Sequence, residues 1–174
     1  MKPEVVERIK TAFDRNGRAI ELRPGVGRKT AVTKTRVVDG LRVETTEGRW
    51  TLVSDASEKS GGGGAAADPG FVVRAALGNC LAMGYVTWAA HLGVPIESVE
   101  IEMHADFDVR GQHGADGIPP GFSEIRCDVR IASSASAADV ARVVEQADRS
   151  SMVGDVFRRA HALVCHLTVV NPTA

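Results

Sequence analysis

Apolar residues near the start of the chain recur at the spacing of one face of an α-helix. The pattern begins at Pro3 and reaches a stop signal at Asn16 and Gly17. It predicts an amphipathic helix, an N-terminal helical extension over residues 1–16. The apolar face of this helix consists of Val5, Val6, Ile9, Ala12 and Phe13.

Strand patterns come next. Residues 30–38 are rich in β-forming side chains, and the pair Asp39-Gly40 is a strong signal for a two-residue hairpin turn. Apolar and polar residues then alternate over residues 41–46, and a second turn leads into a short strand at residues 50–53. The sequence therefore predicts a three-stranded antiparallel meander.

Residues 55–67 form a loop rich in glycine and alanine, with four consecutive glycines at Gly61–Gly64. Such a composition packs poorly and is typical of a mobile connection. A phosphate-binding role would need a Gly-Lys-Ser/Thr sequence after the glycines, and none follows. We therefore interpret the segment as a connecting loop.

A long helix is predicted after this loop. Asp68 is placed as the N-cap and Pro69 as the first helical residue, and the pattern continues to about Leu92 before Gly93 stops it. The apolar stretch from Ala75 to Ala90 is shorter than the roughly 18 to 20 residues that a membrane span requires. We expect a buried helix of a soluble protein and no membrane contact.

The remaining elements alternate between strands and helices. Residues 99–110 alternate strictly between apolar and charged side chains, and after a Gly/Pro-rich loop the segment 125–131 does so again, which predicts an antiparallel strand pair. Two helices separated by a break at Ser150-Ser151 follow, and residues 162–170 alternate as a last strand. Helices segregated from antiparallel strands make the fold class α+β, in a single domain of residues 1–174.

Composition narrows the functional classes. The 174 residues carry 21 Lys plus Arg against 22 Asp plus Glu, so the formal charge of −1 provides no positive field for nucleic acid or an anionic membrane. Three cysteines without a Cys-x-x-Cys pair favour free thiols in a reducing compartment. The N-terminal sequence has no apolar segment of the signal-peptide kind, so we expect a cytoplasmic protein.

The three cysteines have different sequence environments. Cys127 and Cys165 each lie on the apolar face of a predicted strand, so we expect both to be inert core residues. Cys80 lies in a stripe of small residues with Ala76 and Gly84, which indicates a close packing partner. Residue chemistry alone favours a core residue at position 80, since the cation or histidine that would activate its thiol is not located by the sequence.

The histidines give no clear metal site. His104 lies on the polar face of its strand among Glu102 and Asp106, where a solvated charge ladder is the preferred interpretation and a divalent-metal site the alternative. His91 is expected to cap carbonyl groups near the end of the long helix. We expect no metal and no cofactor.

The segment Asp68-Pro-Gly-Phe-Val-Val-Arg-Ala-Ala-Leu-Gly-Asn-Cys80-Leu-Ala-Met83 resembles the signature of the OsmC/Ohr superfamily of thiol-dependent hydroperoxide reductases and their relatives. The shared features are a capped helix start, a cysteine twelve residues after the cap, a Leu-Gly-Val-Pro exit, alternating strands and a second helix. The resemblance extends from about residue 30 to the C-terminus. It implies an intertwined homodimer in which long central helices lie between antiparallel sheets.

The predicted long helix independently favours such a dimer. It is apolar on nearly every side, and a single sheet covers only one side of a helix. A second protomer would supply the missing cover. The side chains that need it are Val72, Val73, Leu77, Leu81, Met83, Tyr85, Val86 and Trp88.

The resemblance also implies a redox site. Cys80 matches the peroxidatic cysteine, which attacks the peroxide bond in an oxidative stress response. The family's glutamate matches Gly70 or Phe71, its hairpin arginine falls near Val38, and its second cysteine matches Ser151. The chain therefore resembles a divergent member that lacks the second cysteine, so an external thiol would have to reduce an oxidised Cys80.

Other residues are candidates for the missing roles. The candidate partners of the Cys80 thiolate are Arg36, Arg42, Arg49 and Arg74. The candidate lining of an apolar pocket at the dimer interface is Met83, Trp50, Phe71 and Trp88. The leading hypothesis is a peroxidase that reduces organic hydroperoxides with one cysteine. The alternatives are a non-catalytic relative that binds an apolar small molecule and, more remotely, a subunit that acts by assembling with another protein.

Overall fold

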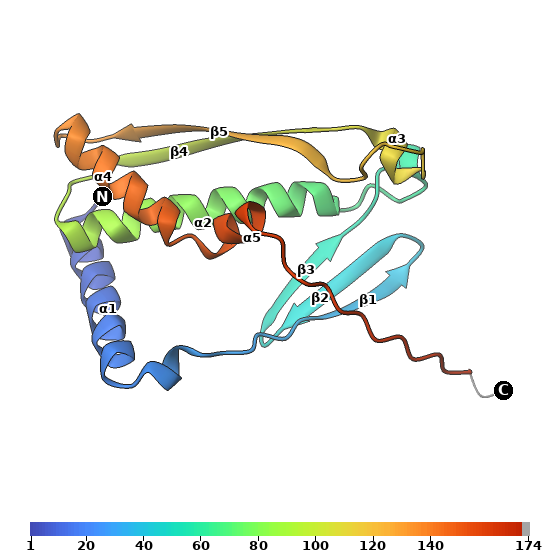
Figure 1. The fold of residues 1–174 in the computed structure, drawn as a ribbon, viewed down its shortest axis with the longest axis horizontal. Coiled ribbons are helices and arrows are strands. Elements are labelled where there is room, and N and C mark those ends of the chain that lie inside the picture. Colours follow the sequence, from blue (N-terminus) through green and yellow to red (C-terminus); the bar gives the residue numbers. More distant parts are fainter. Residues whose placement is uncertain (172–174) are drawn as a thin grey trace.

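The computed structural model describes residues 1–171. A two-stranded sheet covers one side of the long helix α2, with α4 and α5 beside that helix and a three-stranded meander standing apart (Figure 1). The α+β class predicted from the sequence is thus confirmed. The elements are α1 (Pro3–Leu22), η1 (Pro24–Gly27), β1 (Lys34–Asp39), β2 (Arg42–Glu47), β3 (Trp50–Ser54), η2 (Glu58–Ser60), α2 (Pro69–Leu92), β4 (Ser98–Phe107), α3 (Val109–Gln112), β5 (Phe122–Ala132), α4 (Ala137–Arg149) and α5 (Met152–Arg158).

The N-terminal helix is longer than the sequence predicts. The expected stop at Asn16 and Gly17 is wrong, and α1 continues to Leu22, just before Pro24 starts η1. A single glycine costs a helix only about 1 kcal/mol, and the apolar pattern resumes at Ala19 and Ile20. The weak stop signal at Asn16 and Gly17 was therefore outweighed by the helical pattern that continues after it.

Helix α1 docks on the C-terminal end of α2 through an aromatic cluster. The Phe13 ring lies 5.1 Å from the rings of both Trp88 and His91, in edge-to-face geometry. His91 pairs with Asp14 of α1, so its predicted role of capping carbonyl groups is wrong. Hydrogen bonds from Lys10 and His91 hold the pKa of the Asp14 carboxyl below its usual value.

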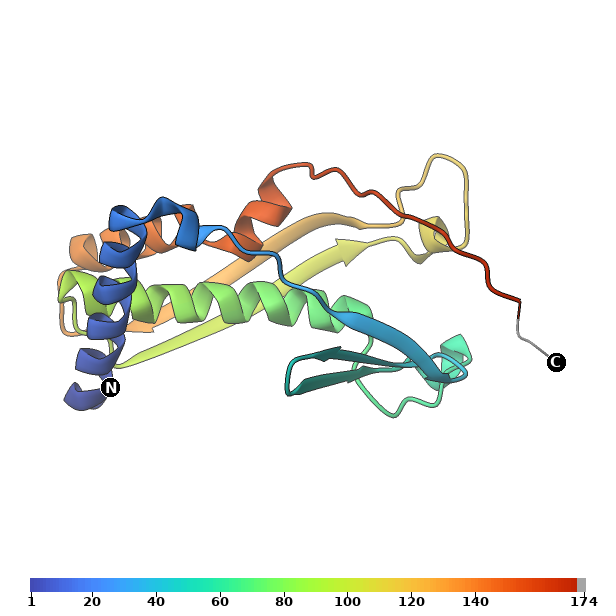
Figure 2. The same ribbon diagram turned by 90° about the horizontal axis from the view of Figure 1, so that it is seen from below.

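The predicted meander is present as β1, β2 and β3, each antiparallel to the next. Its first turn is displaced by one residue: Asp39 pairs with Arg42 as the end of the strand, and the turn consists of Gly40 and Leu41. Gly40 has a φ of +51°, which explains why glycine stands at this position. The meander lies to one side of the N-terminal part of α2 and away from α4 (Figure 2).

The glycine-rich loop has a defined conformation built around Asp55. This carboxylate is buried and accepts hydrogen bonds from the backbone N–H groups of Gly63 and Ala65. The N–H of Gly64 donates to the carbonyl of Ala56, which closes the loop further. The backbone hydrogen bonds, that of Ala65 foremost, hold the pKa of Asp55 below its usual value. The expected loop is therefore present, but fixed hydrogen bonds organise it.

Replacing Asp55 by asparagine should weaken this loop at neutral pH and remove part of the acid sensitivity of the protein. Because folding lowers the Asp55 pKa, its stabilising effect is complete above the unfolded value of about 3.9 and is lost as the pH falls through the lower folded value. Thermal unfolding at pH 7 and in acid measures both effects. Asp116→Asn, at an exposed loop carboxylate, is the control, and equal behaviour of the two variants would contradict the assignment.

Helix α2 has the ends that the sequence predicts. The Asp68 carboxylate accepts the N–H of Phe71, Pro69 is the first helical residue, and Gly93 ends the helix with a φ of +70°. One face of α2 packs on the β4–β5 sheet and on α4. It is also the one helix in residues 1–171 that is long and apolar enough to cross a membrane. Its buried side chains are Leu77, Leu81, Tyr85, Ala89 and Ala90.

The β4–β5 pair confirms the alternating strands but not their full length. The predicted first strand ends at Phe107 rather than Arg110, because the Asp108 carboxylate accepts the Arg110 N–H and caps the short helix α3. The inner face packs on α2. The outer face carries a charge ladder in which His104 contacts Glu102 and Asp128, in agreement with the preferred interpretation of that histidine.

Helices α4 and α5 meet at the predicted break. Ser136 caps α4 and Ser151 caps α5, each by accepting a backbone N–H group three residues later. The small residues of α2 allow α4 to approach closely: a Cβ added at Gly84 would lie 3.6 Å from the Ala147 Cβ. The close packing partner expected for the Ala76, Cys80 and Gly84 stripe is therefore the α4–α5 corner.

The predicted last strand, residues 162–170, has no partner strand within residues 1–171. It leaves α5 as an extended segment whose side chains are exposed (Figure 2). Leu163 and Leu167 are each 89% exposed. A strand requires a neighbour for its hydrogen bonds, and the single chain offers none at this position.

Candidate functional site

Cys80 lies near the middle of α2, half-buried, on the side that faces the start of α5. Its Sγ is 3.3 Å from the Oγ of Ser151, a hydrogen-bond distance for sulfur. The two residues are 71 positions apart in the sequence. The structure thus brings Cys80 next to the residue that matches the second cysteine of the resemblance.

Ser151 is held firmly at this point. Its side chain is only 6% exposed, and its Oγ accepts the N–H of Gly154 at 3.0 Å as the N-cap of α5. A Cβ added at Gly154 would lie 2.8 Å from this Oγ, so the glycine is required for the close approach. The serine hydroxyl therefore has a fixed position beside the Cys80 sulfur.

None of the four candidate arginines bonds to Cys80 within residues 1–171. Arg36 pairs with Glu44 on the meander, and the Arg49 guanidinium lies 4.7 Å above the Trp50 ring. Arg42 is exposed at the start of β2. Arg74 alone among them is on α2, half-buried one and a half turns before Cys80, and it lines a groove with Phe71 and Met103.

The four candidate pocket residues are distributed over separate surfaces of the single chain. Met83 is 70% exposed and lines an apolar groove between α1, α2 and the start of β4. Phe71 lies in the groove of Arg74, Trp50 is on β3, and Trp88 belongs to the aromatic cluster with α1. One chain does not bring these four side chains together.

The other two cysteines differ from the sequence prediction. Both Cys127 and Cys165 are exposed, and the expectation of two core residues is therefore wrong for the single chain. Cys165 lies on the unpaired C-terminal segment. Cys127 does point inward from β5, but it faces a cavity rather than packed side chains. Partial burial raises the pKa of its thiol, so it stays protonated near neutral pH.

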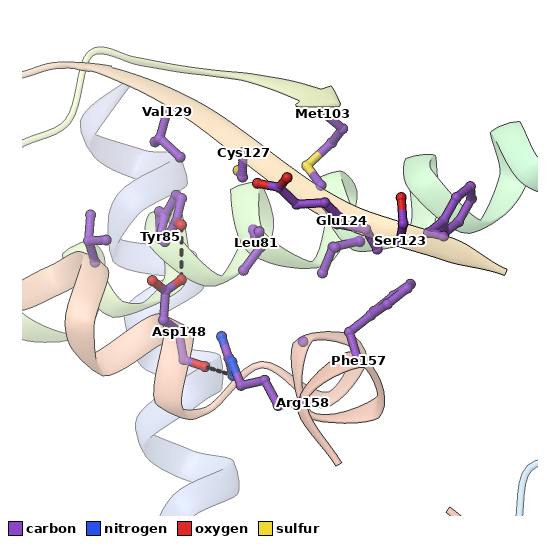
Figure 3. A pocket seen from close by; sticks show the side chains of 15 residues that line it. Leu81, Tyr85, Met103, Ser123, Glu124, Cys127, Val129, Asp148, Phe157 and Arg158 are labelled. Carbon is purple, nitrogen blue, oxygen red and sulfur yellow. Dashed lines mark hydrogen bonds between the residues drawn. The ribbon is translucent and has the colours of Figure 1, made fainter. Parts of the chain in front are cut away.

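A cavity of about 710 Å³ lies between β5, α2 and the α4–α5 corner (Figure 3). Its floor is apolar, with Leu77 and Leu81 of α2 and Val129 of β5 among the lining residues. Polar groups of Tyr85, Asp148, Glu124, Ser123 and Arg158 lie around it. Cavities of this size and composition are typical of small-molecule sites.

The polar side of the cavity is organised by Tyr85. Its hydroxyl donates a 2.9 Å hydrogen bond to the Asp148 carboxylate, and Arg158 donates to the Asp148 main-chain carbonyl (Figure 3). Burial, together with Asp148, raises the pKa of Tyr85 above its usual value. Sequence analysis missed this group. The available signal was a tyrosine on the apolar stripe of α2, which needs a hydrogen-bond partner for its buried hydroxyl.

A family profile supports the resemblance drawn from the sequence. The OsmC-like protein profile matches residues 61–164, more than half of the chain. This range includes α2, the β4–β5 sheet, α4 and α5, and leaves out α1 and the meander. No curated protein matches the chain significantly.

Solved structures share the fold at low sequence identity. An OsmC-like protein from Mycoplasma pneumoniae superposes with a TM-score of 0.64 at 12% identity, over 75% of this chain and 88% of that one. An organic hydroperoxide resistance protein OsmC from Legionella pneumophila gives 0.54 at 18% identity, over 75% and 90%. An OsmC-like hydroperoxide resistance protein from Jannaschia gives 0.51 at 19% identity, over 79% and 91%.

Proposed function

The chain belongs to the OsmC-like protein family, and from this premise we propose that it reduces organic hydroperoxides with Cys80 as the reacting thiol. The observation that carries the proposal is the position of the Cys80 Sγ, half-buried on α2 and 3.3 Å from the fixed hydroxyl of Ser151. Two proteins of similar fold bear the name of hydroperoxide resistance. The reducing cytosol, where thiols persist, is the compartment we assign to this reaction.

The chemistry requires one cysteine and an external thiol. The Cys80 thiolate attacks the terminal oxygen of ROOH, the O–O bond breaks, and RO⁻ leaves and is protonated to the alcohol ROH, which gives a sulfenic acid at Cys80. A thiol R′SH then forms a mixed disulfide with release of water. A second R′SH restores the Cys80 thiol and leaves R′SSR′. Ser151, the residue beside Cys80, cannot form a disulfide, so the proposed cycle takes both reducing equivalents from outside the chain.

A second copy of the chain is part of the proposal. The two sheets do not pair with each other, and the C-terminal segment pairs with neither of them within residues 1–171. Large apolar side chains are exposed on the meander, on α2 and on the C-terminal segment. Trp50 is 67% exposed, Met83 70% and Leu163 89%. A soluble protein covers apolar surface of this extent. We assign this cover to a homodimer.

The dimer would also complete the site. In one chain the meander, with its three arginines Arg36, Arg42 and Arg49, lies away from the α4–α5 corner that adjoins Cys80 (Figure 2). A meander packed on the sheet of a second copy can reach α2 of that copy. A guanidinium there would stabilise the Cys80 thiolate by charge. This arrangement gives the arginines of the meander a role that one chain alone does not offer.

Sedimentation equilibrium should give twice the chain mass of 18.4 kDa. Leu163→Asp combined with Leu167→Asp should shift the protein to monomer, because one face of the C-terminal segment would carry two charges into the interface. His166→Asp combined with Thr168→Asp places the same charges on the opposite face of the segment and should leave the dimer intact. A wild-type monomer, or equal effects of the two pairs, would refute the proposed assembly.

The test of the proposed activity is the consumption of cumene hydroperoxide and of hydrogen peroxide in the presence of excess dithiol reductant. We expect the apolar peroxide to react faster, because the neighbours of Cys80 one turn away or adjacent on α2, such as Leu77, Leu81 and Gly84, are apolar. Consumption no faster than with reductant alone would reject the proposal.

The cavity favours a second candidate function, the binding of an apolar small molecule without catalysis. Cys80 is not among the residues that line the cavity, whose floor of Leu77, Leu81 and Val129 suits an apolar ligand with one hydrogen-bonding end. Tyr85 and Asp148 would orient that end. Absence of peroxide consumption together with saturable binding of an apolar fluorescent probe would favour this function.

A further inference from the structure

Ser151 has a hydroxyl proton with one acceptor close to it. The Ser151 Oγ already accepts the N–H of Gly154 at 3.0 Å, so this contact uses a lone pair and leaves the proton free to donate. Among the described residues, the remaining contact of this Oγ is the Cys80 Sγ at 3.3 Å. Either the hydroxyl or a protonated thiol can donate in this contact, but a thiolate has no proton, so with an ionised Cys80 the hydroxyl is the donor.

Burial decides which form of the sulfur this arrangement favours. Ser151 is 6% exposed, so water does not readily replace its partner. A neutral thiol is a weak acceptor, whereas a thiolate is a strong one, and hydrogen bonds to charged groups are roughly twice as strong as neutral ones. A buried hydroxyl proton is consequently better satisfied when Cys80 is ionised.

We propose that Ser151 is the hydrogen-bond donor to the Cys80 thiolate, so that a serine–cysteine pair forms the reactive centre of this chain. The inference rests on the proposed function in taking the thiolate as the reacting form. It assigns Ser151 a task beyond capping α5. The hydroxyl favours the attacking form of the sulfur and, being unable to form a disulfide, leaves the oxidised sulfur open to an external thiol.

The test is the rate at which iodoacetamide alkylates Cys80 as a function of pH, in a Cys127→Ser and Cys165→Ser background where Cys80 is the single thiol. Ser151→Ala should lower the rate at pH 7 about fivefold to tenfold and move the pH profile to higher pH, since a hydrogen bond to a charged group is lost. Iodoacetamide reports the thiolate without any peroxide. The inference and the proposed activity can therefore fail separately.

Three further variants separate donation from capping. Ser151→Gly has no hydroxyl and adds no charge, yet it weakens an N-cap much less than alanine does, and it should slow alkylation as much as alanine. Ser151→Thr keeps the hydroxyl and should restore most of the rate. Ser136→Ala removes the equivalent cap from α4, away from Cys80, and should leave the rate unchanged.

The outcomes are decisive even if Ser151→Ala folds poorly, because the glycine and threonine variants then carry the comparison. Slow alkylation with glycine and near-normal alkylation with threonine support donation by the hydroxyl. A glycine variant as reactive as the wild type overturns the inference, as does a Ser136→Ala variant that is slowed equally. If the alkylation rate depends on the Ser151 hydroxyl as expected but no peroxide is consumed, the serine–cysteine pair is supported and the proposed reductase activity is rejected.

Discussion

Replacing Cys80 by serine is expected to reduce the consumption of cumene hydroperoxide to the rate given by the reductant alone. A serine hydroxyl is not ionised near neutral pH and cannot form a sulfenic acid, so neither the attack on the O–O bond nor the return step remains. The variant should fold normally, because Cys80 is half-buried and serine is nearly equal in size. Peroxide consumption is followed with a ferrous iron assay, and folding by circular dichroism.

The control is the double variant Cys127→Ser with Cys165→Ser, which removes the two exposed thiols and keeps Cys80. We expect it to retain the wild-type rate. A loss of rate in this variant, with turnover preserved in Cys80→Ser, would assign the chemistry to a different sulfur.

A large effect on stability is expected at Gly84, which lies against Ala147 at the contact between α2 and α4. Gly84→Leu should destabilise the protein by about 1–3 kcal/mol, because the added atoms have no room between the helices. The nearest obstacle is Ala147, itself 2% exposed, whose Cβ lies 3.6 Å from the place of a Cβ at position 84. Displacement of α4 would also move Ser151 away from Cys80, so alkylation of Cys80 should slow.

Gly84→Ala is the matched comparison and should have the opposite sign. A Cβ at 3.6 Å from Ala147 is in ordinary van der Waals contact, and alanine in a helix interior is favoured over glycine by about 1 kcal/mol. Urea unfolding of both variants measures the difference. A leucine variant as stable as the alanine variant would show that the α2–α4 contact is not tight.

Much of the fold could be predicted from local signals, because the residues that start or end a helix act on backbone groups only a few positions away. Asp68 was recognisable as an N-cap, and its carboxylate accepts the expected kind of backbone N–H group in the structure. The small-residue stripe on α2 correctly predicted a close packing partner. These features depend on a few neighbouring residues, which a sequence displays directly.

The remainder depends on contacts that a sequence does not display. The approach of Ser151 to Cys80 joins residues 71 positions apart, and it was anticipated only through the family resemblance. The inward orientation of Cys127 was predicted, whereas the cavity it faces was not, since a cavity is formed by several elements together. The segment 162–170 has the pattern of a strand but no partner strand within residues 1–171. That a second protomer covers it remains a prediction of the proposed dimer.

The most direct test of the account is to identify which cysteine a hydroperoxide oxidises. Reduced protein is treated with one equivalent of cumene hydroperoxide without added thiol, the sulfenic acid is trapped with dimedone, and the peptides are analysed by mass spectrometry. The account predicts dimedone on the peptide that contains Cys80 and a weaker signal there after Ser151→Ala. Label confined to Cys127 or Cys165, or no label on any cysteine, would contradict it.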